Sequence, residues 1–199
     1  MPAGLWTVVR SCRTSARRSV HFPDEEALMC DLCDDPEMTM DGYLDHLCER
    51  LTRERFVVQG VLGSRTSAEY SYTIGLTAQG LPELIVVGVR PPEAHRLLVS
   101  CGEYVLDESI VLPGEGLCSG RFTLEAVEVT RPTDHLVLAG VLYGEAVRAL
   151  QLAWADERGR WPWDPRHRAR QSGQPLLGER APVFCDEHRP DRLDVPSHL

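Results

Sequence analysis

The chain contains neither lysine nor asparagine, and all 21 of its basic residues are arginines. Such a bias is typical of proteins encoded by GC-rich genomes, so it indicates a source rather than a function. No apolar run approaches the roughly 18 residues that a membrane-spanning helix requires, and we therefore expect no contact with a membrane. The net charge of −9 argues against a nucleic-acid-binding protein, because such proteins carry basic surfaces.

Familiar catalytic signatures are missing as well. The chain has no phosphate-binding P-loop, no Rossmann glycine pattern, no H-E-x-x-H zinc motif and no G-x-S-x-G nucleophile motif. Neither His46 nor His135 has an acid or a nucleophile at the spacing of a catalytic triad. The sequence therefore names no reaction, and whether the protein is an enzyme stays open.

Composition predicts one globular domain with irregular ends. The hydrophobic content of 43% and the charged content of 26% are those of an ordinary folded protein. Residues 1–28 are rich in arginine and serine, and we interpret them as a disordered extension or a mis-assigned start. The domain then covers 29–180, and 181–199 form a tail. Seven cysteines, an odd number without a secretory signal, favour a reducing compartment, so we expect the cytoplasm.

The hydrophobic pattern predicts helices and strands in an irregular order. A helix should begin at Met40 after a Thr39 cap, a second at Pro91 and Pro92, and a short third, capped by Thr133 or Asp134, should run to Tyr143. The five expected strands cover 55–62, 70–76, 83–89, 121–129 with a bulge near Ala126, and 147–155. This order predicts an α+β fold with a mostly antiparallel or mixed sheet, and an irregular C-terminal segment packed across it.

Several stretches of the chain resemble one bacterial family, the "domain of unknown function 4262". They are CDLCDDPEMTMDGYLDHL (30–47), FVVQGV (56–61), YTIGLTAQGLPELIVVG (72–88), ALQLAWADERGRWPWD (149–164) and GQPLLG (173–178). The resemblance covers about residues 29–178 and implies a natural start near Met29. It implies no activity, because the family is itself uncharacterised.

Two short motifs at opposite ends of the chain suggest a metal site. Cys30 and Cys33 form a C-x-x-C motif, and Cys185 and His188 have the same two-residue gap. Each pair presents two ligands on one tight turn, so together they would suit a tetrahedral zinc ion. The separation of about 150 residues is not a recognised zinc signature, and free thiols without a metal are the alternative.

A second group of residues suggests a ligand-binding site. Tyr72 and Thr73 lie near the end of one expected strand, Gly75 permits close approach of a ligand, and Glu83 begins the next strand. A carboxylate beside a buried strand requires a partner, and we expect one among Arg160, Arg166 and Arg168. The alternative is that these polar groups only stabilise the sheet.

The segment GRWPWD supplies the other wall of this expected site. Trp161 and Trp163 are suited to cover a flat ligand or to stack on an arginine, while Asp164 is suited to hold an arginine in place. We expect the two indoles to face different ways, one beside the 150–154 strand and one at the pocket. Gln151 and Gln174 offer amide groups with no evident structural role, so they complete the predicted set.

Three functional hypotheses follow. The first is a small-ligand-binding domain with a cleft between the Tyr72–Glu83 region and the Trp161–Gln174 segment. The second is a flavin-binding enzyme of the small-barrel type, which YTIGLT and the aromatic C-terminal segment favour only by analogy of fold. The third is an interaction module stabilised by zinc. The sequence does not indicate an oligomeric state.

Overall fold

A computed structural model of the chain describes residues 39–64, 67–107, 111–167 and 174–181. In this part the protein is a single α+β domain with three α-helices and a six-stranded open sheet. The fold class is therefore the one that the hydrophobic pattern predicts. The expected N-terminal extension (1–28) and all of the expected tail after Ala181 lie outside the described residues.

The sheet is mixed, with the strand order β1-β2-β3-β6-β5-β4. The strands are β1 (Val57–Val61), β2 (Tyr70–Ile74), β3 (Glu83–Val87), β4 (Gly116–Ser119), β5 (Phe122–Glu128) and β6 (Ala149–Trp154). The central pair, β3 and β6, is parallel, and every other neighbouring pair is antiparallel. Because β3 and β6 run in the same direction, the chain must cross from one end of the sheet to the other between them.

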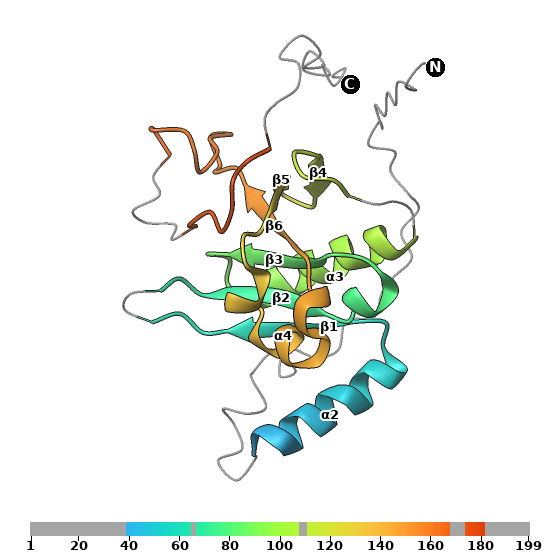
Figure 1. Cartoon of the computed structure of the whole chain (residues 1–199). Coiled ribbons are helices and arrows are strands. Elements are labelled where there is room, and N and C mark those ends of the chain that lie inside the picture. Colours follow the sequence, from blue (N-terminus) through green and yellow to red (C-terminus); the bar gives the residue numbers. More distant parts are fainter. Residues whose placement is uncertain (1–38, 65–66, 108–110, 168–173, 182–199) are drawn as a thin grey trace.

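Helices cover both faces of this sheet (Figure 1). Helix α3 (Pro91–Asp107) packs on one face, with Leu97 and Leu98 against strand residues such as Leu84 and Leu152. Helices α2 (Met40–Arg53) and α4 (Val137–Tyr143) contribute to a second apolar cluster on the opposite face. β3 is buried along its whole length, as expected of a central strand covered on both faces.

The predicted starts of α2 and α3 are confirmed, because a single apolar stripe indicates each of these helices. The Thr39 hydroxyl caps α2 by accepting a hydrogen bond from the Gly42 amide at 3.2 Å, and α3 begins at Pro91 as expected. The predicted cap of α4 is wrong. Thr133 and Asp134 belong to a separate 3-10 turn, and Leu136 precedes α4 without a side-chain cap.

Two predictions about the sheet are corrected. β4 is a short edge strand that the hydrophobic pattern does not predict. Its residues, Gly-Leu-Cys-Ser, have little β-propensity of their own and are held in the sheet by pairing with β5. The expected bulge near Ala126 is absent from the described structure, because the register of β5 with β6 runs without interruption from Leu124 to Glu128. The apparent change of phase arises because both faces of β5 are buried from Leu124 to Val127.

Candidate functional site

Glu83 is fully buried at the start of β3, and its carboxylate is saturated with hydrogen bonds. Thr73 Oγ1 donates to it at 2.7 Å, and the amides of Gly75 and Thr77 donate at 3.0 and 2.8 Å. The Leu76 amide adds a longer contact at 3.3 Å. Burial raises the pKa of Glu83, while the hydrogen bonds from Thr73 and the neighbouring turn act to lower it.

Gly75 is required by this arrangement for a steric reason. Its φ is +126°, which residues with a side chain rarely adopt, and a Cβ placed there would lie 2.8 Å from both Arg55 O and Phe56 Cα. The glycine therefore lets the turn after β2 fold back closely enough for its amides to reach Glu83. Tyr72 is also occupied, because its hydroxyl accepts a hydrogen bond from the Leu138 amide at 3.3 Å.

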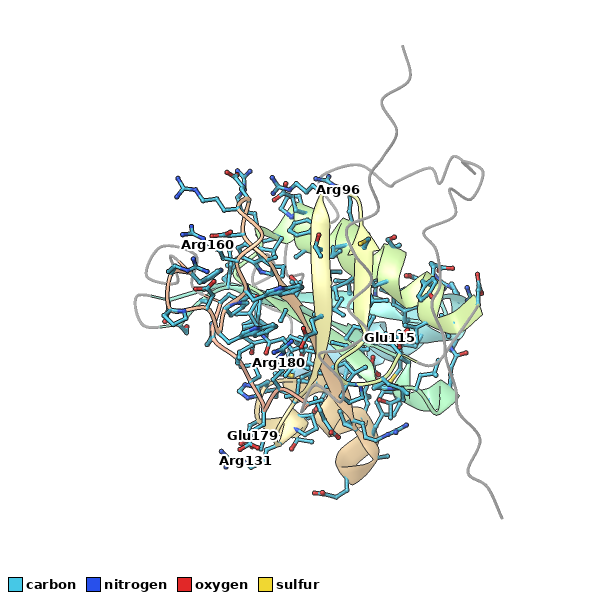
Figure 2. The ribbon with its side chains drawn as sticks, turned by 90° about the horizontal axis from the view of Figure 1, so that it is seen from above. Arg96, Glu115, Arg131, Arg160, Glu179 and Arg180 are labelled. Carbon is cyan, nitrogen blue, oxygen red and sulfur yellow. The ribbon has the colours of Figure 1, made fainter. Side chains whose placement is uncertain are left out.

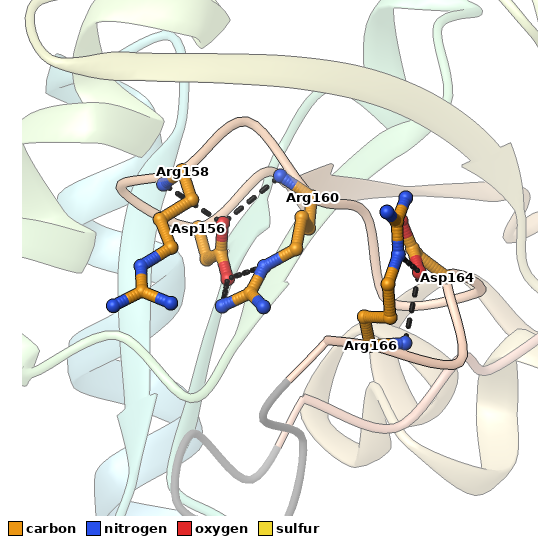
Figure 3. A network of polar contacts seen from close by, with 5 residues as sticks. All are labelled: Asp156, Arg158, Arg160, Asp164 and Arg166. Carbon is orange, nitrogen blue, oxygen red and sulfur yellow. Dashed lines mark hydrogen bonds and ion pairs between the residues drawn. The ribbon is translucent and has the colours of Figure 1, made fainter.

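Arg160 and Arg166, two of the three arginines expected to pair with Glu83, do not do so. Arg160 pairs with Asp156 and Arg166 pairs with Asp164, as the close view in Figure 3 shows. Asp164 thus holds an arginine, as predicted, while Arg168 lies outside the described residues. The need of Glu83 for partners is met by local hydroxyl and amide groups instead.

Asp156 organises the turn that follows β6. Its carboxylate accepts hydrogen bonds from the amides of Arg158 and Arg160, both at 2.9 Å, and from Arg160 Nε at 2.8 Å (Figure 3). Burial acts to raise the pKa of Asp156, but these hydrogen bonds lower it to about 2. Asp164 repeats the pattern with Arg166, whose side chain and amide lower the pKa of that carboxyl. Two short acid-centred turns therefore give residues 155–167, here called the outward limb, a fixed shape.

Residues 174–181, here called the return limb, are attached to β6 by two glutamines. Gln151 is fully buried; its Nε2 donates to Pro175 O, and its Oε1 accepts from the Leu177 amide, both at 2.8 Å. Gln174 forms the reciprocal pair with the main chain of Trp154, at 2.8 and 3.0 Å. The prediction that these amides have no structural role is therefore wrong.

The return limb also lies close to β5. The Thr130 amide donates to Leu177 O at 2.9 Å, and a Cβ on Gly178 would lie 1.8 Å from Glu128 O. Only glycine therefore fits at position 178 in this arrangement. The glutamine pair and Gly178 explain how residues 174–178 are held against β6 and β5 without belonging to a strand.

Trp161 and Trp163 do not face different ways, as the sequence suggested. Their rings are stacked, with centroids 5.1 Å apart and planes 5° from parallel. Arg180 lies over the ring of Trp163 at 4.4 Å and binds Glu125 of β5 through Nε at 2.5 Å and Nη2 at 3.0 Å. In Figure 2, Arg160 and Arg180 lie on the same side of the molecule, where the two limbs run. The alternative of stacking on an arginine is thus realised within the protein.

His167 is a residue that the sequence analysis did not single out. It is the last residue of the outward limb, and its side chain packs edge-on against Trp154, with ring centroids 6.4 Å apart. The residue is only 8% exposed, and neither ring nitrogen has a hydrogen-bond partner in the described structure. Trp154 packs in turn against Phe122 at 6.4 Å and donates its indole N–H to Val87 O. An imidazole with two unpaired nitrogens therefore lies among aromatic rings.

The predicted site residues divide into two groups along the parallel strands. Glu83 pairs with Ala149 at the start of β6, whereas the outward limb leaves β6 after Trp154. Five residues of strand correspond to about 16 Å, so Glu83 does not lie beside the Trp161–Asp164 stretch. Tyr72 and Gln151 do lie in one row across the sheet, but Ile85 occupies the position between them.

All four predicted zinc ligands, Cys30, Cys33, Cys185 and His188, lie outside the described residues, so the zinc hypothesis stays a prediction. Within the residues that the structure does describe, no group of three His, Cys, Asp or Glu side chains is arranged to hold a metal ion. Among the same residues, no helix is long and apolar enough to cross a membrane.

A family model described as "Domain of unknown function (DUF4262)" matches residues 50–168. The chain belongs to this family. The match includes β1 to β6 and the outward limb of the DUF4262 domain, His167 among them, while the return limb follows the matched region. Searches of curated proteins and of solved structures find no match.

The fold of this DUF4262 domain bears on the flavin alternative. That alternative depends on an analogy with small β-barrels, but the sheet here is open, with β1 and β4 at its two edges. The analogy of fold is therefore wrong for the described part of this chain. The aromatic C-terminal segment that also suggested a cofactor holds the stacked pair Trp161 and Trp163.

Proposed function

We propose that this DUF4262 domain binds a small, flat, uncharged molecule at His167. The observation that carries the proposal is the buried imidazole, whose two nitrogens have no hydrogen-bond partner among the described residues. A buried polar group left without a partner costs about 1–3 kcal/mol, and a ligand that supplies the partner recovers this free energy. A neutral imidazole offers one donor and one acceptor, so a ligand with either kind of polar atom can pair with one of its nitrogens.

The surroundings favour a flat ligand without charge. Trp154 packs against the imidazole and Phe122 packs against Trp154, so the neighbouring surface is aromatic. The partly buried acids of the two limbs and of β5 already have arginine partners: Asp156 pairs with Arg160, Asp164 with Arg166 and Glu125 with Arg180. A charged ligand would therefore enter a region whose nearby charges are already neutralised.

This proposal keeps one half of the cleft expected from the sequence. The Trp161–Gln174 side supplies His167, and Trp154 of β6 packs against it. On the Tyr72–Glu83 side, the side chains of Tyr72, Thr73 and Glu83 are engaged in hydrogen bonds within the protein, and a ligand there would have to displace these bonds.

A titration with three probes tests the proposal. Riboflavin, nicotinamide and uracil are uncharged, have a flat ring and carry both donor and acceptor atoms. Binding is followed through tryptophan fluorescence and calorimetry. We expect at least one probe to saturate the protein, and His167→Phe to weaken its binding about tenfold, the equivalent of one lost hydrogen bond. The phenyl ring preserves packing against Trp154, so the variant should melt no lower than the wild type.

Riboflavin 5′-phosphate is the matched control, because it differs from riboflavin only by a charged group. The proposal predicts weaker binding of the phosphate than of riboflavin if riboflavin is the probe that binds. Equal binding of all probes to wild type and His167→Phe, or no binding of any of them, would contradict the proposed function.

A further inference from the structure

Arg180 connects the two limbs to the sheet. It belongs to the return limb, its guanidinium lies over Trp163 of the outward limb, and it forms two hydrogen bonds with Glu125 of β5. The Glu125 side chain is 10% exposed and the Arg180 side chain 36% exposed, so the pair lies at the boundary between interior and solvent. We refer to Glu125, Trp163 and Arg180 together as the clasp.

We propose that the clasp controls access to His167 by opening and closing the outward limb. This inference rests on the proposed function, because it assigns a gate to the same site. His167 is tied to the clasp through a short chain of backbone bonds: its amide donates to Asp164 O at 2.8 Å, and the Asp164 amide donates to Trp161 O at 2.9 Å. Movement of the stacked tryptophans therefore moves the turn that ends at His167.

The strengths of the contacts decide which part opens first. The return limb is held by the buried amides of Gln151 and Gln174, whose partners would be left unpaired on separation. The outward limb meets the clasp through one arginine–aromatic contact, Arg180 over Trp163 at 4.4 Å, and such a contact contributes less than buried hydrogen bonds, while the Arg180–Glu125 pair stays with the return limb and β5. The outward limb thus opens at Trp163 and Arg180 while the return limb stays on β6.

The chemistry of Arg180 also makes the clasp specific for arginine. A planar guanidinium binds both oxygens of Glu125 and stacks on an indole at the same time. Lysine keeps the positive charge but has neither the fork nor the flat face. Arg180→Lys therefore separates the contribution of the guanidinium's shape from that of its charge. Arg53→Ala is the control, because Arg53 is exposed and pairs with Glu49 within α2, away from both limbs.

Stopped-flow binding of riboflavin, or of whichever of the three probes binds, tests the gate. We expect Arg180→Ala and Arg180→Lys to raise both the association and the dissociation rate constants about tenfold, with a smaller change in Kd, because a gate changes rates more than affinity. Arg53→Ala should leave both rates unchanged. Rates in both Arg180 variants equal to those of the wild type would overturn the inference.

Amide hydrogen exchange without any probe separates failure of the gate from failure of the binding site. In Arg180→Ala we expect the amides of Asp164 and His167 to exchange about tenfold faster, while the Leu177 amide, held by Gln151, keeps its protection. Unchanged exchange at Asp164 and His167 would overturn the clasp even if ligands bind at His167. Faster exchange there with no probe binding would support the clasp and contradict only the proposed function.

Discussion

The buried side chain of Gln151 accepts a hydrogen bond from the amide of Leu177, 26 positions later in the chain, at 2.8 Å. The same side chain donates a hydrogen bond to Pro175 O, so one glutamine pairs with a main-chain carbonyl and a main-chain amide of the return limb. This contact fixes the return limb on β6, and the limb in turn brings Arg180 to Glu125 and Trp163.

Replacing Gln151 by methionine tests this attachment. The substitution keeps the volume of the side chain but leaves Pro175 O and the Leu177 amide without partners, and we expect a loss of about 2–4 kcal/mol in the free energy of unfolding. Gln79→Met is the matched control, because that amide is exposed and makes one hydrogen bond, to Arg55 O. Urea denaturation of both variants gives the comparison, and equal small losses would contradict a structural role for Gln151.

Gly178→Ala should detach the return limb from β5. The added methyl group would meet Glu128 O, a main-chain atom that cannot rotate away, so the limb itself must shift. We expect a lower melting temperature and faster exchange of the Thr130 amide, which donates to Leu177 O. Gly60→Ala is the control, since its Cβ would meet only Ser71 Oγ at 3.8 Å. A protected Thr130 amide in Gly178→Ala would show that the fit at this position is looser than described.

Thr73→Val tests the hydroxyl that joins β2 to Glu83. Thr73 Oγ1 donates to the carboxylate and accepts from the Leu84 amide at 2.8 Å, so valine leaves two buried groups short of a partner. We expect a loss of about 2–3 kcal/mol in chemical denaturation. Thr123→Val on the exposed side of β5 should change stability by less than about 0.5 kcal/mol. A similar effect at both positions would mean that the hydroxyl of Thr73 contributes little.

The turn centred on Asp156 should weaken in acid. Because the pKa of Asp156 is lowered to about 2 from an ordinary 3.8, its contribution to stability is present above pH 3.8 and is lost as the pH falls through 2. We expect Asp156→Asn to be less stable than the wild type at pH 5, and this difference to shrink at pH 3 and below. Urea denaturation at pH 5, 4 and 3 measures it; a difference that grows in acid would contradict the assignment.

Much of the fold follows from periodicity, while the contacts of the limbs do not. The apolar stripe of α2 predicts a helix with one buried face, and the apolar run of β3 predicts a strand buried on both faces. β5 misled the sequence analysis because Glu125 is a buried acid, and its partner Arg180 lies 55 positions away. No local pattern reveals such a pairing.

The site was predictable only in part for the same reason. Glu83 was correctly singled out as a buried acid in need of partners, but backbone amides, which have no sequence signal, supply most of them. His167 was overlooked because it stands in a run of arginines that is typical of an exposed loop. Its one available signal is that it is the neutral ring in that run, close in sequence to two tryptophans.

The central claim, recognition of a ligand by His167, is tested most directly by NMR of the imidazole nitrogens. With 15N-labelled histidine, the His167 signals are assigned by their absence from His167→Phe, and riboflavin, nicotinamide and uracil are added in turn. We expect one probe to shift the signals of the His167 ring nitrogens while the signals of the other histidines stay in place. Ring nitrogens of His167 that do not respond to any of the three probes would contradict it.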